Sequence, residues 1–263
     1  MLKHSLAFLI INKEYLILLT IIAQTVLPAL KFNLKKMKTI VIVGGSKGIG
    51  NAVLMQNLEN CRIINISRTA PDITHPNLIH FAIDVLGDPL PEFESMDALV
   101  YCPGSINLKP ILGLSLDDFR NDFEINVVGA VKVIQHYLPA LKKGENPSIV
   151  LFSSVAAKLG MPFHASIAAS KAAVEGLVKS LGAELAPLIR INAIAPTITE
   201  TSLSASILRN DRMKENMKER HPLKNYLKPE EVGRMAGYLI SEDAASISGQ
   251  VFAMDYGLVS FKL

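Results

Sequence analysis

The stretch Thr-Ile-Val-Ile-Val-Gly-Gly-Ser-Lys-Gly-Ile-Gly, residues 39–50, indicates the fold of this chain. Its first five residues are β-branched and mostly apolar, as in a strand that a parallel sheet buries on both faces. Gly44 allows a sharp turn, Gly48 leaves room for a close approach to the backbone, and Gly50 lets a following helix pack against the strand. A glycine loop between a strand and a helix is typical of a site that holds a pyrophosphate at the helix N-terminus.

Strand and helix patterns alternate along the rest of the chain. Further apolar runs typical of strands lie at residues 62–67, 78–83, 98–102, 148–153, 189–194 and 250–254. Helical patterns lie at residues 48–58, 116–141, 166–185, 202–220 and 229–240. This order predicts an α/β fold, a doubly wound Rossmann-type three-layer sandwich with a mostly parallel seven-stranded sheet. Only twelve residues separate Asp84 from Asp97, so we expect the connecting helix there to be shortened or lost.

The first 36 residues differ from the remainder in composition. They contain apolar runs at residues 6–11 and 15–30, five lysines and one glutamate. Neither run is a convincing membrane span, which requires about 20 apolar residues. We expect a single domain over residues 37–263 and favour Met37 as the natural start, with residues 1–36 as an upstream translation. A membrane-anchoring segment, a secretory signal and a simple terminal extension remain alternatives for residues 1–36.

Charge and cysteine usage narrow the class of protein. Residues 37–263 contain 22 basic and 23 acidic residues, so their charge does not point to nucleic acid. The two cysteines, Cys61 and Cys102, lack metal-ligand spacing and are too few for a disulfide framework. We therefore expect a cytoplasmic protein without a metal site, or a membrane-associated one if residues 1–36 act as an anchor. We also expect Cys102 to be an inert core residue.

Further motifs follow the predicted strands. They are Asp84-Val85, Asn126 within Ile-Asn-Val-Val-Gly, Ser153-Ser154, Ser170-Lys171, Asn-Ala-Ile-Ala-Pro at residues 192–196, and the stretch 248–255. With the Gly-x-x-x-Gly-x-Gly spacing of the first loop, they make residues 38–257 resemble the short-chain dehydrogenase/reductase family. The resemblance implies an oxidoreductase that binds a nicotinamide dinucleotide. It also implies a homodimer or homotetramer in which the helices predicted at 116–141 and 166–185 pair with their copies.

The choice between the two nicotinamide cofactors can be argued from charge. An acidic residue at the end of the second strand would suit the ribose hydroxyls of NAD(H), but this strand ends in Ser67 and Arg68. Arg68 and Lys47 of the glycine loop are cations that suit the 2′-phosphate of NADP(H). The alternative is that both are solvated surface charges. We expect NADP(H).

The resemblance implies a set of cofactor-binding positions, with Asp84 at the adenine and the backbone of Val85 beside it. The full set is Gly44, Ser46, Lys47, Gly48, Ile49, Gly50, Arg68, Asp84, Val85, Gly104, Asn126, Lys171, Pro196 and Ile198.

The catalytic residues that the resemblance implies are incomplete in this chain. Asn126, Ser154 and Lys171 stand at family positions, but the position of the proton-donating tyrosine, four residues before Lys171, holds Ile167. His164, seven residues before the lysine, is a possible substitute because two helical turns separate the two. The alternative is a histidine in the preceding loop with no chemical role.

Two other positions depart from the family pattern. Cys102-Pro103-Gly104 replaces Asn-Ala-Gly, and Pro103 removes a backbone donor there. Thr197 replaces a glycine after Pro196, close to the expected nicotinamide.

The sequence leaves two functions open. One is a working NADP(H)-dependent reductase of a carbonyl (3-oxoacyl-like) or enoyl substrate, with an altered proton donor. The other is a catalytically impaired family member that serves as an NADP(H)-binding sensor or a structural partner. Residues 197–221 should form a substrate lid, and their basic side chains would suit an acidic substrate or an acyl carrier protein, or form a solvated helix face.

Overall fold

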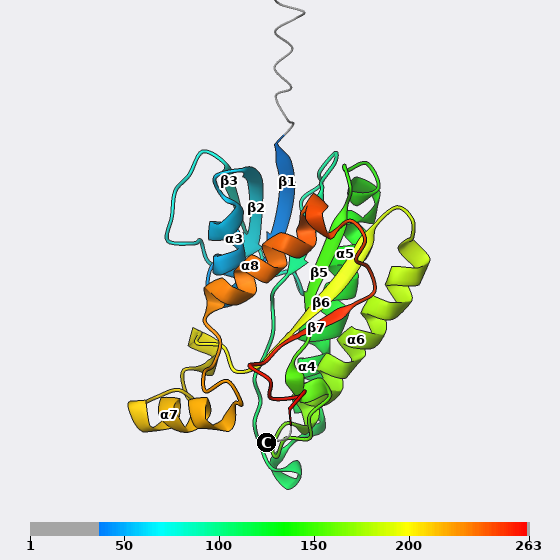
Figure 1. Cartoon of the computed structure of the whole chain (residues 1–263). Coiled ribbons are helices and arrows are strands. Elements are labelled where there is room, and N and C mark those ends of the chain that lie inside the picture. Colours follow the sequence, from blue (N-terminus) through cyan, green and yellow to red (C-terminus); the bar gives the residue numbers. More distant parts are fainter. Residues whose placement is uncertain (1–36, 262–263) are drawn as a thin grey trace, which may run out of the picture. The chain divides into compact units, whose positions relative to one another are not determined.

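The computed structural model describes residues 37–261, and the expectations for residues 1–36 lie outside the described residues. A sheet of seven strands has the order β3-β2-β1-β4-β5-β6-β7 (Figure 1). Every neighbouring pair is parallel, so this sheet is wholly rather than mostly parallel. The strands are β1 (Lys38–Val43), β2 (Cys61–Ser67), β3 (Leu78–Ala82), β4 (Ala98–Tyr101), β5 (Ser148–Phe152), β6 (Arg190–Pro196) and β7 (Val251–Met254).

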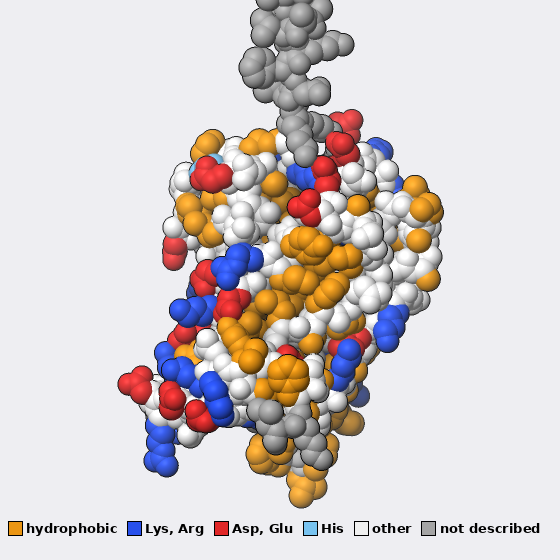
Figure 2. Space-filling model, in the orientation of Figure 1, with side chains coloured by type: hydrophobic (Ala, Val, Ile, Leu, Met, Phe, Trp, Pro, Cys, Tyr) orange, Lys and Arg blue, Asp and Glu red, His pale blue; other side chains and the backbone are white. Residues whose placement is uncertain are grey.

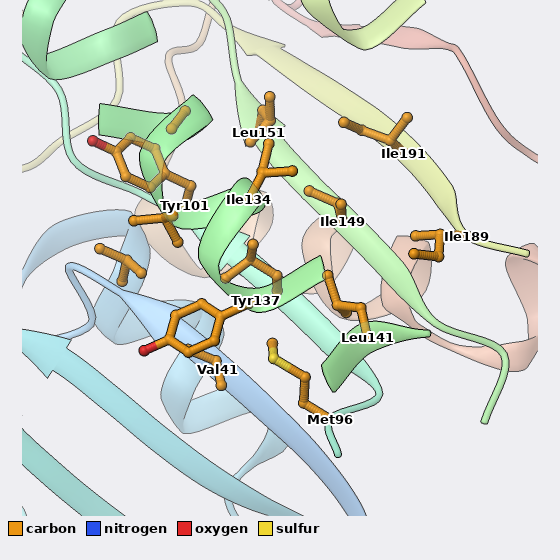
Figure 3. Packing of buried hydrophobic residues seen from close by; sticks show 14 of the residues in the cluster. Val41, Met96, Tyr101, Ile134, Tyr137, Leu141, Ile149, Leu151, Ile189 and Ile191 are labelled. Atoms are coloured by element: carbon orange, nitrogen blue, oxygen red, sulfur yellow. The ribbon is translucent and has the colours of Figure 1, made fainter. Parts of the chain in front are cut away.

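Helices cover both faces of the sheet. On one face α3 (Gly48–Asn57) packs against α8 (Pro229–Ile240) (Figure 1). On the other face lie α4 (Leu116–Phe123), α5 (Gly129–Leu141) and α6 (Ala165–Leu185). Figure 3 shows Tyr137 and Leu141 of α5 packed among the buried aliphatic side chains of the strands. These three layers confirm the predicted doubly wound fold.

The long helix predicted at residues 116–141 contains a π-helical segment. Residues Glu124–Val128 separate α4 from α5 without ending the helical path. Asn126 lies in this segment, and its amide group donates a hydrogen bond of 2.7 Å to the carbonyl oxygen of Asp122. The carbonyl of Asp122 thus accepts a hydrogen bond from the side chain of Asn126. Short π-helical segments are frequent at functional sites.

Two connections differ in their agreement with the sequence pattern. No helix occupies the connection between β3 and β4, as its short length predicted; the ammonium of Lys132 instead donates to the carbonyls of Leu86 and Asp88 at 3.1 and 3.2 Å.

The single helix predicted at residues 202–220 is wrong. A 3-10 turn at Ser202–Ser204 precedes α7 (Asp211–Arg220), because Asn210 is extended and its side chain caps α7.

Within residues 37–261 there is no helix long and apolar enough to cross a membrane. Cys61 and Cys102 are both free thiols. The predicted pairing of copies through the two long helices stays a prediction, although the outer face of α6 exposes small side chains at Ala165, Ala169 and Ala172.

The turn between β1 and α3 gives a test of the fold. Gly44 has a φ of +80°, and a Cβ at Gly50 would overlap the carbonyl group of Gly44. Because both partners are backbone atoms in buried elements, we expect Gly50→Ala to lower the free energy of unfolding by about 1–3 kcal/mol in urea titrations. Gly160→Ala is the control, since a Cβ at Gly160 meets nothing within 4 Å. Equal stability of the two variants would contradict the close approach.

Candidate active site

A cavity of about 490 Å³ lies where the carboxyl ends of β4, β5 and β6 meet the first turn of α3. Ligands of open α/β sheets bind at this edge, where the direction of the strand order reverses. Residues from each element line it, including Ile49, Gly104, Phe152 and Pro196. The walls are mostly apolar, which suits a substrate with a hydrocarbon portion.

Four of the predicted catalytic positions meet in this cavity. Ser154, after β5, lines it together with His164, Ile167 and Lys171, which α6 and its N-terminus supply. Ile167 is only 5 % exposed, and its aliphatic side chain occupies the place from which a tyrosine would reach the cavity. Ile167 and Lys171 therefore share one face of α6, as their spacing predicted. His164 precedes the helix, and its Nδ1 lies 2.6 Å from the carbonyl oxygen of Pro162.

Lys171 is the buried charge of the site. Its side chain is 8 % exposed, and its ammonium donates a hydrogen bond of 2.8 Å to the carbonyl oxygen of Phe152. Burial lowers the pKa of Lys171 to about 8, although the nearby Asp122 carboxylate opposes this shift. The single hydroxyl proton of Ser153 is shared between the Glu175 carboxylate at 3.0 Å and the backbone carbonyl of Lys171 at 3.2 Å, and this contact fixes the helix here.

Asn126 lies behind the cavity in a buried polar network. Its amide nitrogen is 3.3 Å from the Ser105 hydroxyl and 3.4 Å from the Ser170 hydroxyl. The Ser105 hydroxyl in turn donates to the Asp122 carboxylate at 2.5 Å and lines the cavity. Asn126 Oδ1 and Asp122 Oδ2 are buried without a hydrogen-bond partner among residues 37–261. The network therefore retains acceptor capacity beside the cavity.

The glycine loop meets the end of β2 outside this cavity. Asn65 accepts a hydrogen bond of 2.9 Å from the backbone of Gly45, and Thr69 donates to the Ser46 hydroxyl at 3.2 Å. Lys47 and Arg68, the sequence neighbours of this second pair, are both exposed. The two cations thus belong to adjoining loops at the carboxyl edge of the sheet.

These loops fit the dinucleotide that the sequence predicts. Lys47 at the N-cap of α3 makes no side-chain cap, and a Cβ at Gly48 would come within 3.2 Å of the Thr201 methyl group. The N-terminus of α3 thus has a narrow glycine-lined approach that suits a phosphate. After β3, at the positions predicted to meet the adenine, Asp84 Oδ1 accepts a hydrogen bond of 3.1 Å from the backbone of Leu86, and Val85 is buried.

Some expectations need correction or refinement. Cys102 packs against the core but is not sealed within it: the residue is half-buried and also lines the cavity. Burial raises the pKa of its thiol, which agrees with the predicted inertness. Gly104 lies beside Asn126 Oδ1 and Lys171 Nζ, and its predicted role in cofactor binding stays a prediction.

The segment predicted as a lid forms one wall of the cavity. Leu203, Ile207 and Arg220 line it. Charged side chains of both signs gather on α7 (Figure 2), and Lys214 pairs with Glu200 at 2.6 Å. Most of the lid's basic groups thus form a solvated face.

A buried pair anchors this wall to the end of β6. The hydroxyl of Thr197 lies 2.7 Å from Nε2 of His221, and Nδ1 of that ring lies 2.7 Å from the carbonyl oxygen of Met217. Since a carbonyl only accepts, Nδ1 carries the proton and Thr197 donates to Nε2. The threonine that replaces a family glycine is therefore fixed by a second buried side chain.

Three polar residues of this region were missed from the sequence: Asn65, Ser105 and Asp122. The signal for Asp122 is its place four residues before Asn126, one helical turn away on the same face. Asn65 interrupts the apolar run of β2. Polar residues at apolar positions are the pattern to search for.

The buried lysine gives a stability test. A lysine whose pKa is lower in the folded protein than in the unfolded chain opposes folding fully below about pH 8, and ceases to do so above about pH 10.5. The parent should therefore gain about 3 kcal/mol relative to Lys171→Met between these pH values. Urea titrations across this range measure it. The exposed Lys179→Met is the control, and a constant difference for Lys171→Met would refute the pKa shift.

Comparison with known proteins identifies the family of the chain. A family model described as "Enoyl-(Acyl carrier protein) reductase" matches residues 64–259. The chain is 30% identical to a 3-oxoacyl-[acyl-carrier-protein] reductase of Thermotoga maritima over 247 residues, 84% of this chain and 98% of that protein. It is 27% identical to carbonyl reductase [NADPH] 2 of Sus scrofa over 234 residues, 84% and 96% of the two chains.

A solved structure shares the fold over a similar span. The ligand-free aldohexose dehydrogenase of Thermoplasma acidophilum superposes with a TM-score of 0.79 at 26% identity, over 86% of this chain and 95% of that one. Since the family model spans most of the sequence and the relatives align over nearly their whole length, this chain belongs to the short-chain dehydrogenase/reductase family.

Proposed function

We propose that this protein is an NADP(H)-dependent oxidoreductase that reduces the carbonyl group of a 3-oxoacyl-like substrate. The observation that carries the proposal is the meeting of Ser154 and Lys171 in one largely apolar cavity at the carboxyl edge of the sheet. A bound reduced nicotinamide would supply the hydride. Ser154 would orient the carbonyl, and Lys171 would supply positive charge where the oxygen becomes negative.

The choice of NADP(H) has two supports. Lys47 and Arg68 are exposed cations on loops that the hydrogen bond between Ser46 and Thr69 holds together. A 2′-phosphate between them would gain charge-assisted hydrogen bonds from both. One relative of similar length is named as an NADPH-dependent carbonyl reductase.

The choice of a 3-oxoacyl-like substrate rests on the cavity and on one relative. Leu108, Met161, Phe163 and Ile207 give the cavity apolar walls that would accept an acyl chain. The relative from Thermotoga maritima is named as a 3-oxoacyl-[acyl-carrier-protein] reductase.

The alternative is a catalytically impaired protein that binds NADP(H) as a sensor or serves as a structural partner. Ile167 favours it, because an aliphatic side chain donates no proton. General acid catalysis contributes roughly 10²–10⁴-fold to such reactions, and its loss leaves what positioning and electrostatics supply. The two proposals differ in whether the cavity still accepts a substrate.

Arg68 gives a test of cofactor preference. We expect Arg68→Asp to weaken NADPH binding at least about tenfold in calorimetric titrations, because it replaces attraction of the 2′-phosphate by repulsion. NADH binding should change much less. Arg62→Asp, an equal charge change at the exposed amino end of β2, is the control. An Arg68→Asp protein with the parent's NADPH affinity would refute the preference.

Ile167 gives a test of the reductase itself. We expect Ile167→Tyr to raise kcat for 3-oxoacyl substrates about 10²-fold, since the phenol would enter the cavity within reach of the Lys171 face. Ile167→Phe supplies the same ring without the hydroxyl and should not gain turnover. If Ile167→Tyr binds NADPH yet gains nothing over the phenylalanine variant, the impaired alternative stands.

A further inference from the structure

Asp122 is a buried carboxylate that the proposed function does not yet use. Its side chain is 2 % exposed, on the inner face of α4. Oδ1 accepts from Ser105 at 2.5 Å, while Oδ2 has no hydrogen-bond partner among the described residues. Burying an ionised carboxylate costs several kcal/mol unless an opposite charge compensates it. A nearby cation would therefore stabilise the ionised form of Asp122.

Lys171 is the cation whose charge Asp122 influences, although the two side chains form no direct ion pair among residues 37–261. The carboxylate favours the charged form of this lysine and opposes the effect of burial on it. The ammonium donates one hydrogen bond, to Phe152, and makes no other within residues 37–261. Asn126 Oδ1 and Lys171 Nζ both lie close to Gly104, at 3.4 and 3.6 Å from the point where a Cβ would stand. Spare N–H donors thus lie near unused acceptors at the edge of the cavity.

No tyrosine stands four residues before Lys171, so the lysine has no phenol there whose pKa it would lower. In the described cavity it is the buried ammonium one helical turn beyond Ile167, and its pKa of about 8 makes it an acid that can release a proton near neutral pH. A lysine at its ordinary pKa of about 10.4 would hold its proton much more firmly.

We propose that the Lys171 ammonium is itself the proton donor of this site, and that the buried Asp122, held by Ser105, is the positioning residue that keeps this ammonium charged. The inference rests on the proposed reduction. As hydride adds to the carbonyl carbon, the electron pair of the C=O bond moves to oxygen. That oxygen takes a proton from Nζ: an O–H bond forms, an N–H bond breaks, and the amine is left neutral. A proton from solvent then restores the ammonium.

Other titratable groups near Lys171 belong to the elements that pack around it. The segment after β4 contributes the Cys102 thiol, whose pKa burial raises. On α6 itself, Glu175 is engaged by Ser153 and, at 3.8 Å, by Lys158. From α4 comes Asp122. The negative charge of Asp122 favours the charged form of the lysine more strongly than the Cys102 thiol does.

The test is the pH profile of reductive turnover in the full chain with NADPH and a short 3-oxoacyl thioester. Turnover should fall as pH rises through about 8, because the donor is the protonated amine. Asp122→Asn should move the midpoint of this alkaline limb, the fall of turnover with rising pH, about one unit lower. Asp122→Glu should return the midpoint to its parent value. The control is Asp117→Asn on the same helix, where the exposed Asp117 pairs with Arg120. Coincident limbs for Asp122→Asn and the parent would overturn the proposal.

A measurement without turnover separates this inference from the proposed function. Titration of ¹³Cε-labelled lysine by NMR follows Lys171, whose signal is identified by its loss in Lys171→Arg. Its midpoint should fall by the same one unit in Asp122→Asn and stay unchanged in Asp117→Asn. An unchanged midpoint overturns the Asp122 role even if turnover is found.

Two further outcomes bear on the donor itself. His164→Ala should keep the limb at its parent position. Loss of that limb would assign the proton to the imidazole and overturn the role of Lys171. A parent that binds NADPH and titrates as expected, yet reduces no carbonyl substrate, also overturns the donor step. Failure to bind NADPH at all instead refutes the proposed function, while the NMR midpoints still decide whether Asp122 sets the charge of Lys171.

Discussion

The parallel register of β1 with its two neighbours is the constraint on which the site depends. Val43 pairs with Ile66 on one side and with Tyr101 on the other, so three strands end at the same level. Each continues into a loop that carries chemistry: the glycine loop, the loop with Arg68, and the loop with Gly104. Because hydrogen bonds between strands fix this level, residues about 60 positions apart in the sequence reach one edge of the sheet.

The parts of the fold that the sequence predicted correctly are those that repeat a simple pattern. β-branched runs gave the strands, and glycines at 44 and 50 gave the turn between β1 and α3, where φ and close packing exclude other residues. The helix predicted at 202–220 failed because one cap, Asn210, outweighs a favourable composition on both sides. Local propensity is summed over a window, whereas a cap acts at a single residue.

The candidate site divides in the same way. Positions 167 and 171 share a face of α6, so their spacing alone placed them in one cavity, whereas His164 reaches it from the residue before the helix. Ser105 and Asp122 meet across 17 positions and from different elements, and no periodicity predicts such a pair. Cys102 packs against the core as predicted, but its apolar character could not reveal that it also lines the cavity. Packing of side chains from separate elements is the information that a single sequence lacks.

The π-helical segment has a consequence for how this region can change. A residue inserted in or removed from a helix rotates everything beyond it by about 100°. The wide turn at Glu124–Val128 absorbs such an offset, so that α4 turns Asp122 inward while α5 turns Val133 and Tyr137 toward the sheet. Loss of a single residue there would bring the two helices out of phase. The segment thus acts as a rotational spacer, and its length is as constrained as the identity of any side chain it carries.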